Sequence, residues 1–321
     1  MGHLRWPKSL HSQMESVFAT IRGLGEKKSL NTGGIRSVGT WRSYRSEAHR
    51  FAKYLQSRGV SDLRAIDAVQ QAAKEYMAER LAVARLKGHS HQTQQARASA
   101  FAALERGFNR FFEQRNMPLR LDLKESCREY LTLSRAYLST RQEYQDGTRA
   151  YPDPARLVSA IRSEAHALQA SLQYQGGMRS EGVGAPSGIV RNPFTIDNLQ
   201  GYRRDIVSGK RVGLVATKEK GGKWTSHFIP KATYERLEAY LKEHERLESR
   251  YQDYRNAVIT AAKITGQYAP GRATHGLKTA FAKHRYAECV KHGFSHERAM
   301  QQTSWELSHN RWDITLIYTR G

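Results

Sequence analysis

Five short stretches in the second half of the sequence decide the fold. THGLK at 274–278, ELSH at 306–309 and TLIY at 315–318 lie close to the C-terminal end. GGMRSE at 176–181 follows an apolar helical pattern, and KEKGGK at 218–223 has the glycines of a β-hairpin tip between two extended stretches. Each stretch alone is weak evidence, but together they supply Arg, Lys, His, Lys, His and Tyr in chain order.

The charge balance indicates a polyanionic partner. The 321 residues contain 52 Lys+Arg and 30 Asp+Glu, a net charge of +22, and the excess is +12 in residues 1–150 and +10 in residues 151–321. An apolar content of 39% with 10% aromatic residues is enough to form cores, so a disordered basic tail is excluded. A positive field over two globular domains suits DNA or RNA, and an anionic membrane surface is the weaker alternative.

The composition excludes several other classes of protein. No run of apolar residues approaches the length of a membrane-spanning helix, and MGHLRWPKSLHSQ at the start lacks the apolar core of a signal peptide. Cys127 and Cys289 have no His or Cys at ligand spacing. We therefore expect a cytoplasmic, nucleoid-associated protein with no disulfide, no metal, no cofactor and no membrane partner.

The spacing of apolar residues predicts two domains. A helical stripe starts near Val38 and contains Trp41, Tyr44, Ala48, Phe51 and Leu55. Further helices are predicted over 63–86 and 93–116, and 121–140 fits one more. The polar faces of the first domain carry basic residues that we expect to contact phosphates in part: Arg42, Arg45, Arg50, Lys53, Arg97 and Arg106.

The second domain has a mixed pattern. A helix is predicted over 157–173, strands over 212–217 and 224–230, and helices from 234 to the end. We place a helical DNA-binding domain at 1–140, a linker at 141–154 and a catalytic domain at 155–321.

Residues from about 35 to 318 resemble the tyrosine recombinases, also called the phage integrase family. Arg179 matches the first catalytic arginine, Lys220 the mobile hairpin lysine, His275 the histidine of H-x-x-R, His309 the histidine of L-G-H, and Tyr318 the nucleophile. The resemblance implies a mainly α fold with a small β-sheet. It consists of an N-terminal helical core-binding (SAM-like) domain and an α+β catalytic domain.

The sequence departs from the family pattern at three positions. Lys278 replaces the second arginine of H-x-x-R, and Ser308 replaces the glycine of L-G-H. The acidic residue expected three positions after the first arginine is Gly182 here, with Glu181 one place early. The long step from His275 to His309 predicts a helical extension over 288–302.

These residue types suit strand cleavage by transesterification. The Tyr318 oxygen would attack phosphorus and keep the bond energy in a covalent ester. A phenol has a pKa near 10, so a base is needed, and His275 is the candidate. Arg179 and His309 would donate to the phosphate oxygens, and Lys220 would protonate the leaving 5′ oxygen, with Lys218 or Lys223 as alternatives.

The resemblance implies a site-specific DNA recombinase or integrase. It would act on double-stranded DNA as a homotetramer through 3′-phosphotyrosyl intermediates and a Holliday junction, with accessory DNA-bending proteins, as part of a phage or bacterial mobile genetic element. A type IB topoisomerase is the alternative enzyme. The replacement of an arginine by Lys278 leaves a third interpretation, a catalytically weakened DNA-binding relative.

Overall fold

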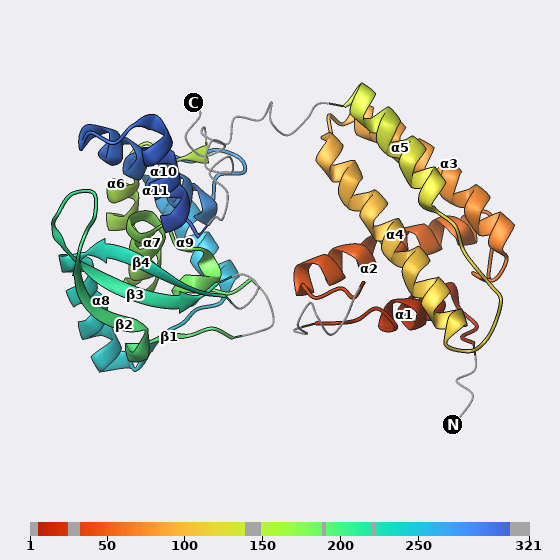
Figure 1. The fold of residues 1–321 in the computed structure, drawn as a ribbon, viewed down its shortest axis with the longest axis horizontal. Helices are drawn as coiled ribbons and strands as arrows, with labels where there is room; N and C mark the ends of the chain where they lie inside the picture. The colour runs from red at the N-terminus through yellow and green to blue at the C-terminus, as the bar shows by residue number, and fades with distance from the viewer. Residues whose placement is uncertain (1–5, 25–32, 139–148, 188–190, 220–222, 309–321) are drawn as a thin grey trace. The chain divides into compact units, whose positions relative to one another are not determined.

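The computed structural model describes residues 6–24, 33–138, 149–187, 191–219 and 223–308. The chain divides into two compact units, residues 1–144 and 145–321, which are shown in Figure 1. The expected fold class, mainly α with a small β-sheet, is confirmed. None of the helices in these ranges is long and apolar enough to cross a membrane.

The first unit is a helical bundle. Its helices are α1 (Leu10–Ala19), α2 (Val38–Ser57), α3 (Ile66–Leu86), α4 (His91–Glu113) and α5 (Lys124–Tyr137). Helix α4 packs against α1, α2 and α5, and α3 packs against α2 and α5. The predicted apolar stripe lies on α2, where Trp41, Phe51 and Leu55 are buried in the bundle core. Helix α2 begins where the hydroxyl of Ser37 accepts the backbone N–H of Thr40.

One residue assigned to a polar face is largely withdrawn from solvent. The Arg97 side chain is only 12% exposed, and its Nε donates to the buried carboxylate of Glu47 at 2.7 Å. The Tyr76 hydroxyl donates to the same carboxylate at 2.8 Å. Arg97 therefore balances a buried charge, and the prediction that it lies on a solvated face is wrong; Arg42 and Lys53 are exposed as expected.

The second unit surrounds a three-stranded antiparallel sheet. The sheet has the order β2 (Leu199–Arg204), β3 (Arg211–Lys218), β4 (Trp224–Pro230), and a separate short pair joins β1 (Phe194–Thr195) to β5 (Arg246–Leu247). The strands expected from the sequence, 212–217 and 224–230, are β3 and β4, which pair in register from Val212 opposite Pro230 to Lys218 opposite Trp224. The hairpin prediction is therefore confirmed up to the described ends of its strands.

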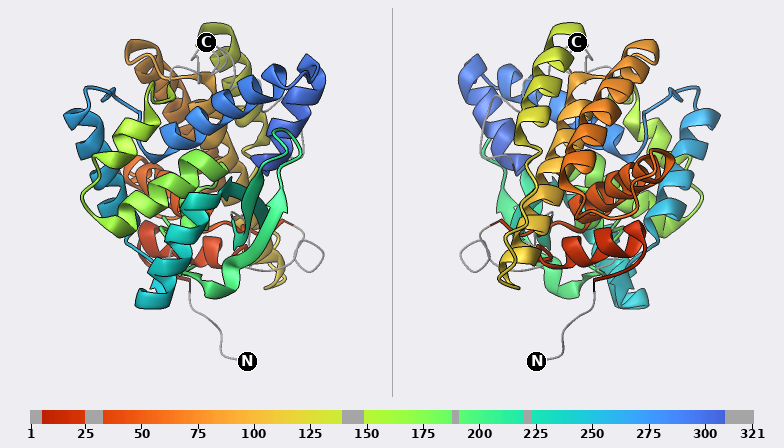
Figure 2. Two further views of the ribbon diagram at one scale, coloured as in Figure 1. Left: turned by 90° about the vertical axis from the view of Figure 1, so that its left-hand side faces the viewer. Right: turned by 90° about the vertical axis from the view of Figure 1, so that its right-hand side faces the viewer.

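Helices cover the sheet and build the rest of this unit. They are α6 (Pro154–Ser159), α7 (Glu164–Gly176), α8 (Lys231–His244), α9 (Tyr251–Ile264), α10 (Thr274–Lys291) and α11 (His296–Glu306). Helix α7 packs against β4 and α10, and α8 packs against β3. Figure 2 shows α10 and α11 in blue, one against the other.

Two segments predicted as single helices are each interrupted in the structure. The helix predicted over 157–173 is two helices, because Ser163 caps a new one by accepting the His166 backbone N–H. The extension predicted over 288–302 is also broken. Helix α10 ends just before Gly293, which adopts a φ of 82°, and Ser295 then caps the start of α11.

The approach of α1 to α4 depends on Gly107. A Cβ added there would lie 2.7 Å from the Val17 carbonyl oxygen and 2.9 Å from its Cγ1. We expect Gly107→Ala to lower the free energy of unfolding by about 1–3 kcal/mol, because the helices would have to separate. Gly39→Ala, whose Cβ would lie 3.8 Å from the Ser37 hydroxyl, is the matched control and should be neutral or stabilising. Equal thermal midpoints for the two variants would contradict the packing argument.

Candidate active site

Arg179 follows a turn that only glycine can make. Helix α7 ends at Gly176, and Gly177 adopts a φ of 65°. A Cβ on Gly177 would also lie 2.6 Å from the ring of Phe281 on α10. The chain therefore passes close against α10 before Arg179, which directly precedes the short 3₁₀ helix Ser180–Val183.

A buried carboxylate holds Arg179 in place. The Oε1 atom of Glu219 accepts the Arg179 backbone N–H at 2.7 Å, and Oε2 pairs with Nη1 of the same arginine. Glu219 is 1% exposed at the side chain and Arg179 is 27% exposed. The carboxylate therefore fixes both the backbone and the guanidinium, while part of the guanidinium remains at the surface.

Glu219 occupies the space that Gly182 leaves empty. A Cβ on Gly182 would lie 3.1 Å from Cγ2 of Thr217 and 3.2 Å from Oε1 of Glu219. The Thr217 hydroxyl donates to the Gly182 carbonyl at 2.8 Å, so the end of β3 is fastened to this turn. A carboxylate therefore lies beside position 182, although residue 182 itself has no side chain. Sequence reasoning missed Glu219, although the missing acid after Arg179 was the available signal.

Lys278 is a buried lysine whose charge acts on the same carboxylate. It comes from the second turn of α10 and is 1% exposed, and its Nζ donates to the Leu307 carbonyl at 3.1 Å. Burial lowers the pKa of Lys278 to about 7, against the opposing attraction of Glu219. For Glu219, burial acts to raise the pKa, but the charge of Lys278 and the other contacts outweigh it and hold the pKa below its usual value.

His227 on β4 is a neutral core histidine beside this cluster. Its Nδ1 lies 2.8 Å from the Gly176 carbonyl, which can only accept, so the proton sits on Nδ1. Its Nε2 lies 3.0 Å from the Thr225 hydroxyl and 3.6 Å from Oε1 of Glu219. Burial lowers the pKa of His227 to about 4, which keeps the ring uncharged at neutral pH.

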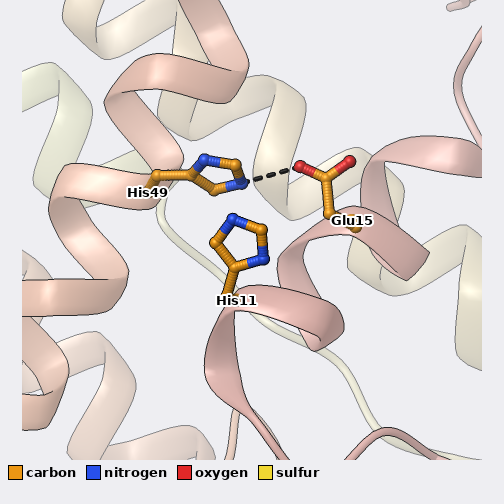
Figure 3. Close-up of side chains that lie close together, drawn as sticks. All are labelled: His11, Glu15 and His49. Atoms are coloured by element: carbon orange, nitrogen blue, oxygen red, sulfur yellow. Dashed lines mark ion pairs between the residues drawn. The ribbon is translucent and has the colours of Figure 1, made fainter.

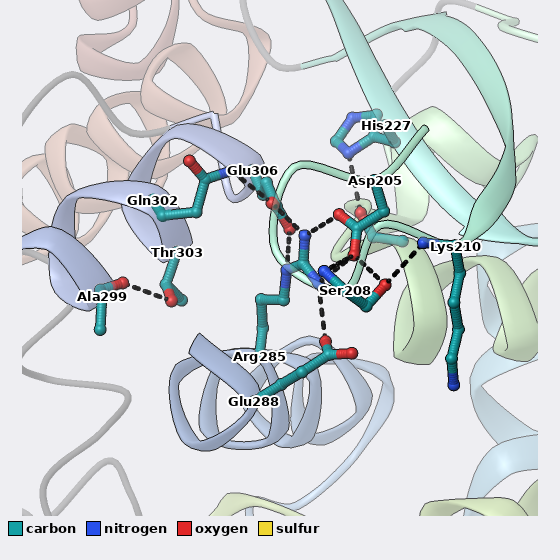
Figure 4. A network of polar contacts seen from close by, with 11 residues as sticks. Asp205, Ser208, Lys210, His227, Arg285, Glu288, Ala299, Gln302, Thr303 and Glu306 are labelled. Carbon is teal, nitrogen blue, oxygen red and sulfur yellow. Dashed lines mark hydrogen bonds and ion pairs between the residues drawn. The ribbon is translucent and has the colours of Figure 1, made fainter. Parts of the chain in front are cut away.

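The end of α11 is held by a second charged network on α10. Arg285 donates to Glu306 through Nε and Nη2, each at 2.7 Å, and through Nη1 to Glu288 at 2.6 Å and Asp205 at 3.1 Å. Figure 4 shows these carboxylates gathered around the guanidinium. Arg285 is thus committed to the interior and cannot replace the second arginine of the family pattern.

The replacement of glycine by Ser308 falls at a backbone position that favours glycine. Ser308 has a φ of 60°, in the left-handed region. Leu307 before it is fully buried and packs with Phe281 and Ala282. The L-G-H pattern therefore has a backbone reason here, and this chain adopts the same turn with a residue less suited to it.

The described residues bring together only part of the predicted site. Arg179 pairs with Glu219, the charge of buried Lys278 lowers the pKa of the same carboxylate, and His275 is exposed on the first turn of α10, one turn before Lys278. Lys220, His309 and Tyr318 lie outside the described residues. The catalytic roles of all six residues remain predictions. The domain bounds 1–140 and 155–321 also remain predictions.

Comparison with known proteins identifies the fold. The sequence matches no family model and no curated protein. The structure is similar to XerH site-specific recombinase bound to palindromic difH substrate in a post-cleavage complex. The TM-score is 0.53 at 16% identity, over 99% of this chain and 96% of that chain. The chain shares its fold with XerH.

Two further likenesses are weaker. XerH bound to difH in a pre-cleavage complex gives a TM-score of 0.47 at 14% identity, over 100% of this chain and 97% of that chain. Protelomerase TelA covalently complexed with substrate DNA gives 0.43 at 11% identity, over 98% of this chain and 96% of that chain.

The burial of Lys278 predicts a pH-dependent stability. Its pKa is about 7 when folded and near 10.5 when unfolded, so between these values the unfolded state binds more protons and stability rises with pH. Denaturant unfolding at pH 7 and pH 9 should show the parent gaining about 2 kcal/mol relative to Lys278→Met. An identical pH dependence in the two proteins would mean that the ammonium is solvated.

Proposed function

We propose that this chain is a site-specific recombinase that cuts and rejoins double-stranded DNA through a covalent bond to Tyr318. The observation that carries the proposal is the fixed position of Arg179, whose backbone N–H and guanidinium both pair with the buried carboxylate of Glu219. Arg179 and Glu219 come from two separate segments of a fold similar to that of a site-specific recombinase.

The proposed reaction needs a nucleophile, a general base, hydrogen-bond donors that stabilise the phosphate oxygens, and a general acid. The Tyr318 oxygen forms a bond to phosphorus as the bond to the 5′ oxygen breaks, which leaves a 3′-phosphotyrosyl ester. His275 takes the phenol proton and Lys220 gives a proton to the leaving oxygen. Arg179 and His309 donate to the non-bridging oxygens, where negative charge increases in the transition state.

The geometry of Arg179 suits this task. Glu219 engages its Nη1 and its backbone N–H, and the side chain keeps 27% of its surface exposed. The donors that face solvent can therefore reach a phosphate while the other edge stays fixed. A fixed guanidinium needs little reorganisation when the transition state forms.

Lys278 requires a different role from the arginine it replaces. Its ammonium is buried against the Leu307 carbonyl and does not face solvent. We infer that Lys278 acts from the interior: its protonated form acts on the charge of Glu219, and its Nζ holds the Leu307 carbonyl at the end of α11, two residues before His309 in the sequence. The same observation favours the second candidate function, a DNA-binding relative with weakened cleavage.

Substitution of the proposed nucleophile separates the candidates. Tyr318→Phe should abolish covalent trapping on a suicide DNA substrate and leave DNA affinity nearly unchanged, because only the hydroxyl is lost. Tyr268→Phe, at a half-exposed tyrosine, is the matched control and should trap DNA like the parent. If the parent itself traps no DNA but binds it, the weakened relative is the correct interpretation. Relaxation of supercoils without a specific site would indicate the topoisomerase.

Glu219 is the residue most open to a rescue experiment. Glu219→Ala should lower the single-turnover cleavage rate by about tenfold or more, with DNA affinity changed much less, because Arg179 loses its fixed partner. Gly182→Glu added to Glu219→Ala returns a carboxylate to the same space and should restore part of the rate. Cleavage by Glu219→Ala at the parent rate would remove Glu219 from the mechanism.

A further inference from the structure

Two histidines and a carboxylate meet between α1 and α2 of the first unit. His11 and Glu15 are four residues apart on α1, so their side chains lie on one face, a single turn apart. His49 comes from α2, where its neighbours Ala48 and Phe51 are buried in the core. Figure 3 shows the three side chains close together.

The distances are those of a ligand cluster. The Nε2 atom of His49 lies 2.7 Å from Oε1 of Glu15, and the centroids of the two imidazole rings are 4.1 Å apart. One ligand atom from each of the three residues lies within 4.8 Å of the others. Among the described residues, His11, Glu15 and His49 are the three histidine or carboxylate side chains that lie close enough together to bind one ion.

The contact between His49 and Glu15 is incomplete as a hydrogen bond. The Nε2 atom of His49 is buried and has no hydrogen-bond partner of acceptable geometry among the described residues, despite the nearby oxygen. Leaving a buried polar atom without a partner is unfavourable. A cation bound by this nitrogen and by the Glu15 carboxylate would give the nitrogen the partner that it lacks.

We propose that His11, Glu15 and His49 bind a divalent transition-metal ion of the zinc type. Two imidazoles and one carboxylate form a set that suits Zn²⁺, with water completing the coordination. Bond lengths near 2.0–2.2 Å place neighbouring ligand atoms about 3.4 Å apart, so ligand atoms separated by up to 4.8 Å would draw together by at most about 1.4 Å. His11 is exposed and can make this movement.

Arg45 can accommodate the ion. Its Nε and Nη2 donate to Oε1 of Glu15 at 2.9 and 2.7 Å, and the His49 contact falls on the same oxygen. Glu15 can therefore turn Oε2 towards a metal while Oε1 keeps the guanidinium. The bound ion would tie α1 to α2, since its ligands come from both helices.

Metal binding would also raise the positive charge beside the basic side of α2. Arg42, Arg50 and Lys53 are exposed there, and Arg45 and His49 line the same shallow surface. The ion would offset the charge of Glu15, so DNA affinity should rise when the site is filled. This consequence rests on the proposed function, whereas metal binding itself does not.

The test is a titration of the metal-stripped full chain with Zn²⁺, followed by calorimetry, and with Co²⁺, followed by its visible absorption. The parent should bind one Zn²⁺ per chain, and its thermal midpoint should rise because the ion binds the folded state. His11→Ala and His49→Ala should each weaken binding by at least about tenfold, because each removes one of three ligands. His89→Ala, at an exposed histidine of the same unit, is the matched control and should bind like the parent.

Two results would overturn the site. One is a parent chain that takes up no Zn²⁺ in the micromolar range; the other is unchanged affinity in both histidine variants. If His49→Ala disturbs the fold by circular dichroism, Glu15→Gln tests the same site without removing a ring. Zinc binding that depends on His11 and His49 but leaves DNA affinity unchanged would support the metal site and remove only its link to the proposed function.

Discussion

The second unit depends on one buried negative charge, the carboxylate of Glu219. A carboxylate removed from water is costly unless hydrogen bonds and positive charges surround it. Here the backbone N–H and the side chain of Arg179 contact the carboxylate, and the charge of buried Lys278 on α10 also lowers its pKa. The ion pair between Arg179 and Glu219 therefore joins the turn after α7 to the end of β3.

Helix α10 transmits that constraint to α11. Its second turn carries Lys278, which holds the Leu307 carbonyl, and two turns later Arg285 holds Glu306. Burial raises the pKa of Glu306, although Arg285 opposes the effect, so the carboxylate needs this partner to stay charged. The residues before His309 are therefore fixed by polar contacts on two sides as well as by the packing of Leu307.

The sequence predicted the elements better than it predicted their charge partners. Periodic apolar residues placed α2, α3 and the two long strands, because such patterns depend on local geometry. The breaks before α7 and α11 were not predicted. A serine such as Ser163 or Ser295 caps a helix only where the chain turns, and the sequence alone did not show those turns. Glu219 could not be predicted from spacing, because its role depends on the absence of a side chain at Gly182, 37 positions earlier in the sequence.

The inward side chains of β3 carry a consequence for insertions and deletions. Gly213, Val215 and Thr217 are the better buried residues along β3, and Glu219 continues the same alternation directly after the strand. Removing one residue from β3 would reverse that alternation and turn a lysine into the space that the carboxylate fills. Insertions or deletions within β3 would therefore keep its inward side chains facing inward only when they change the strand by two residues at a time.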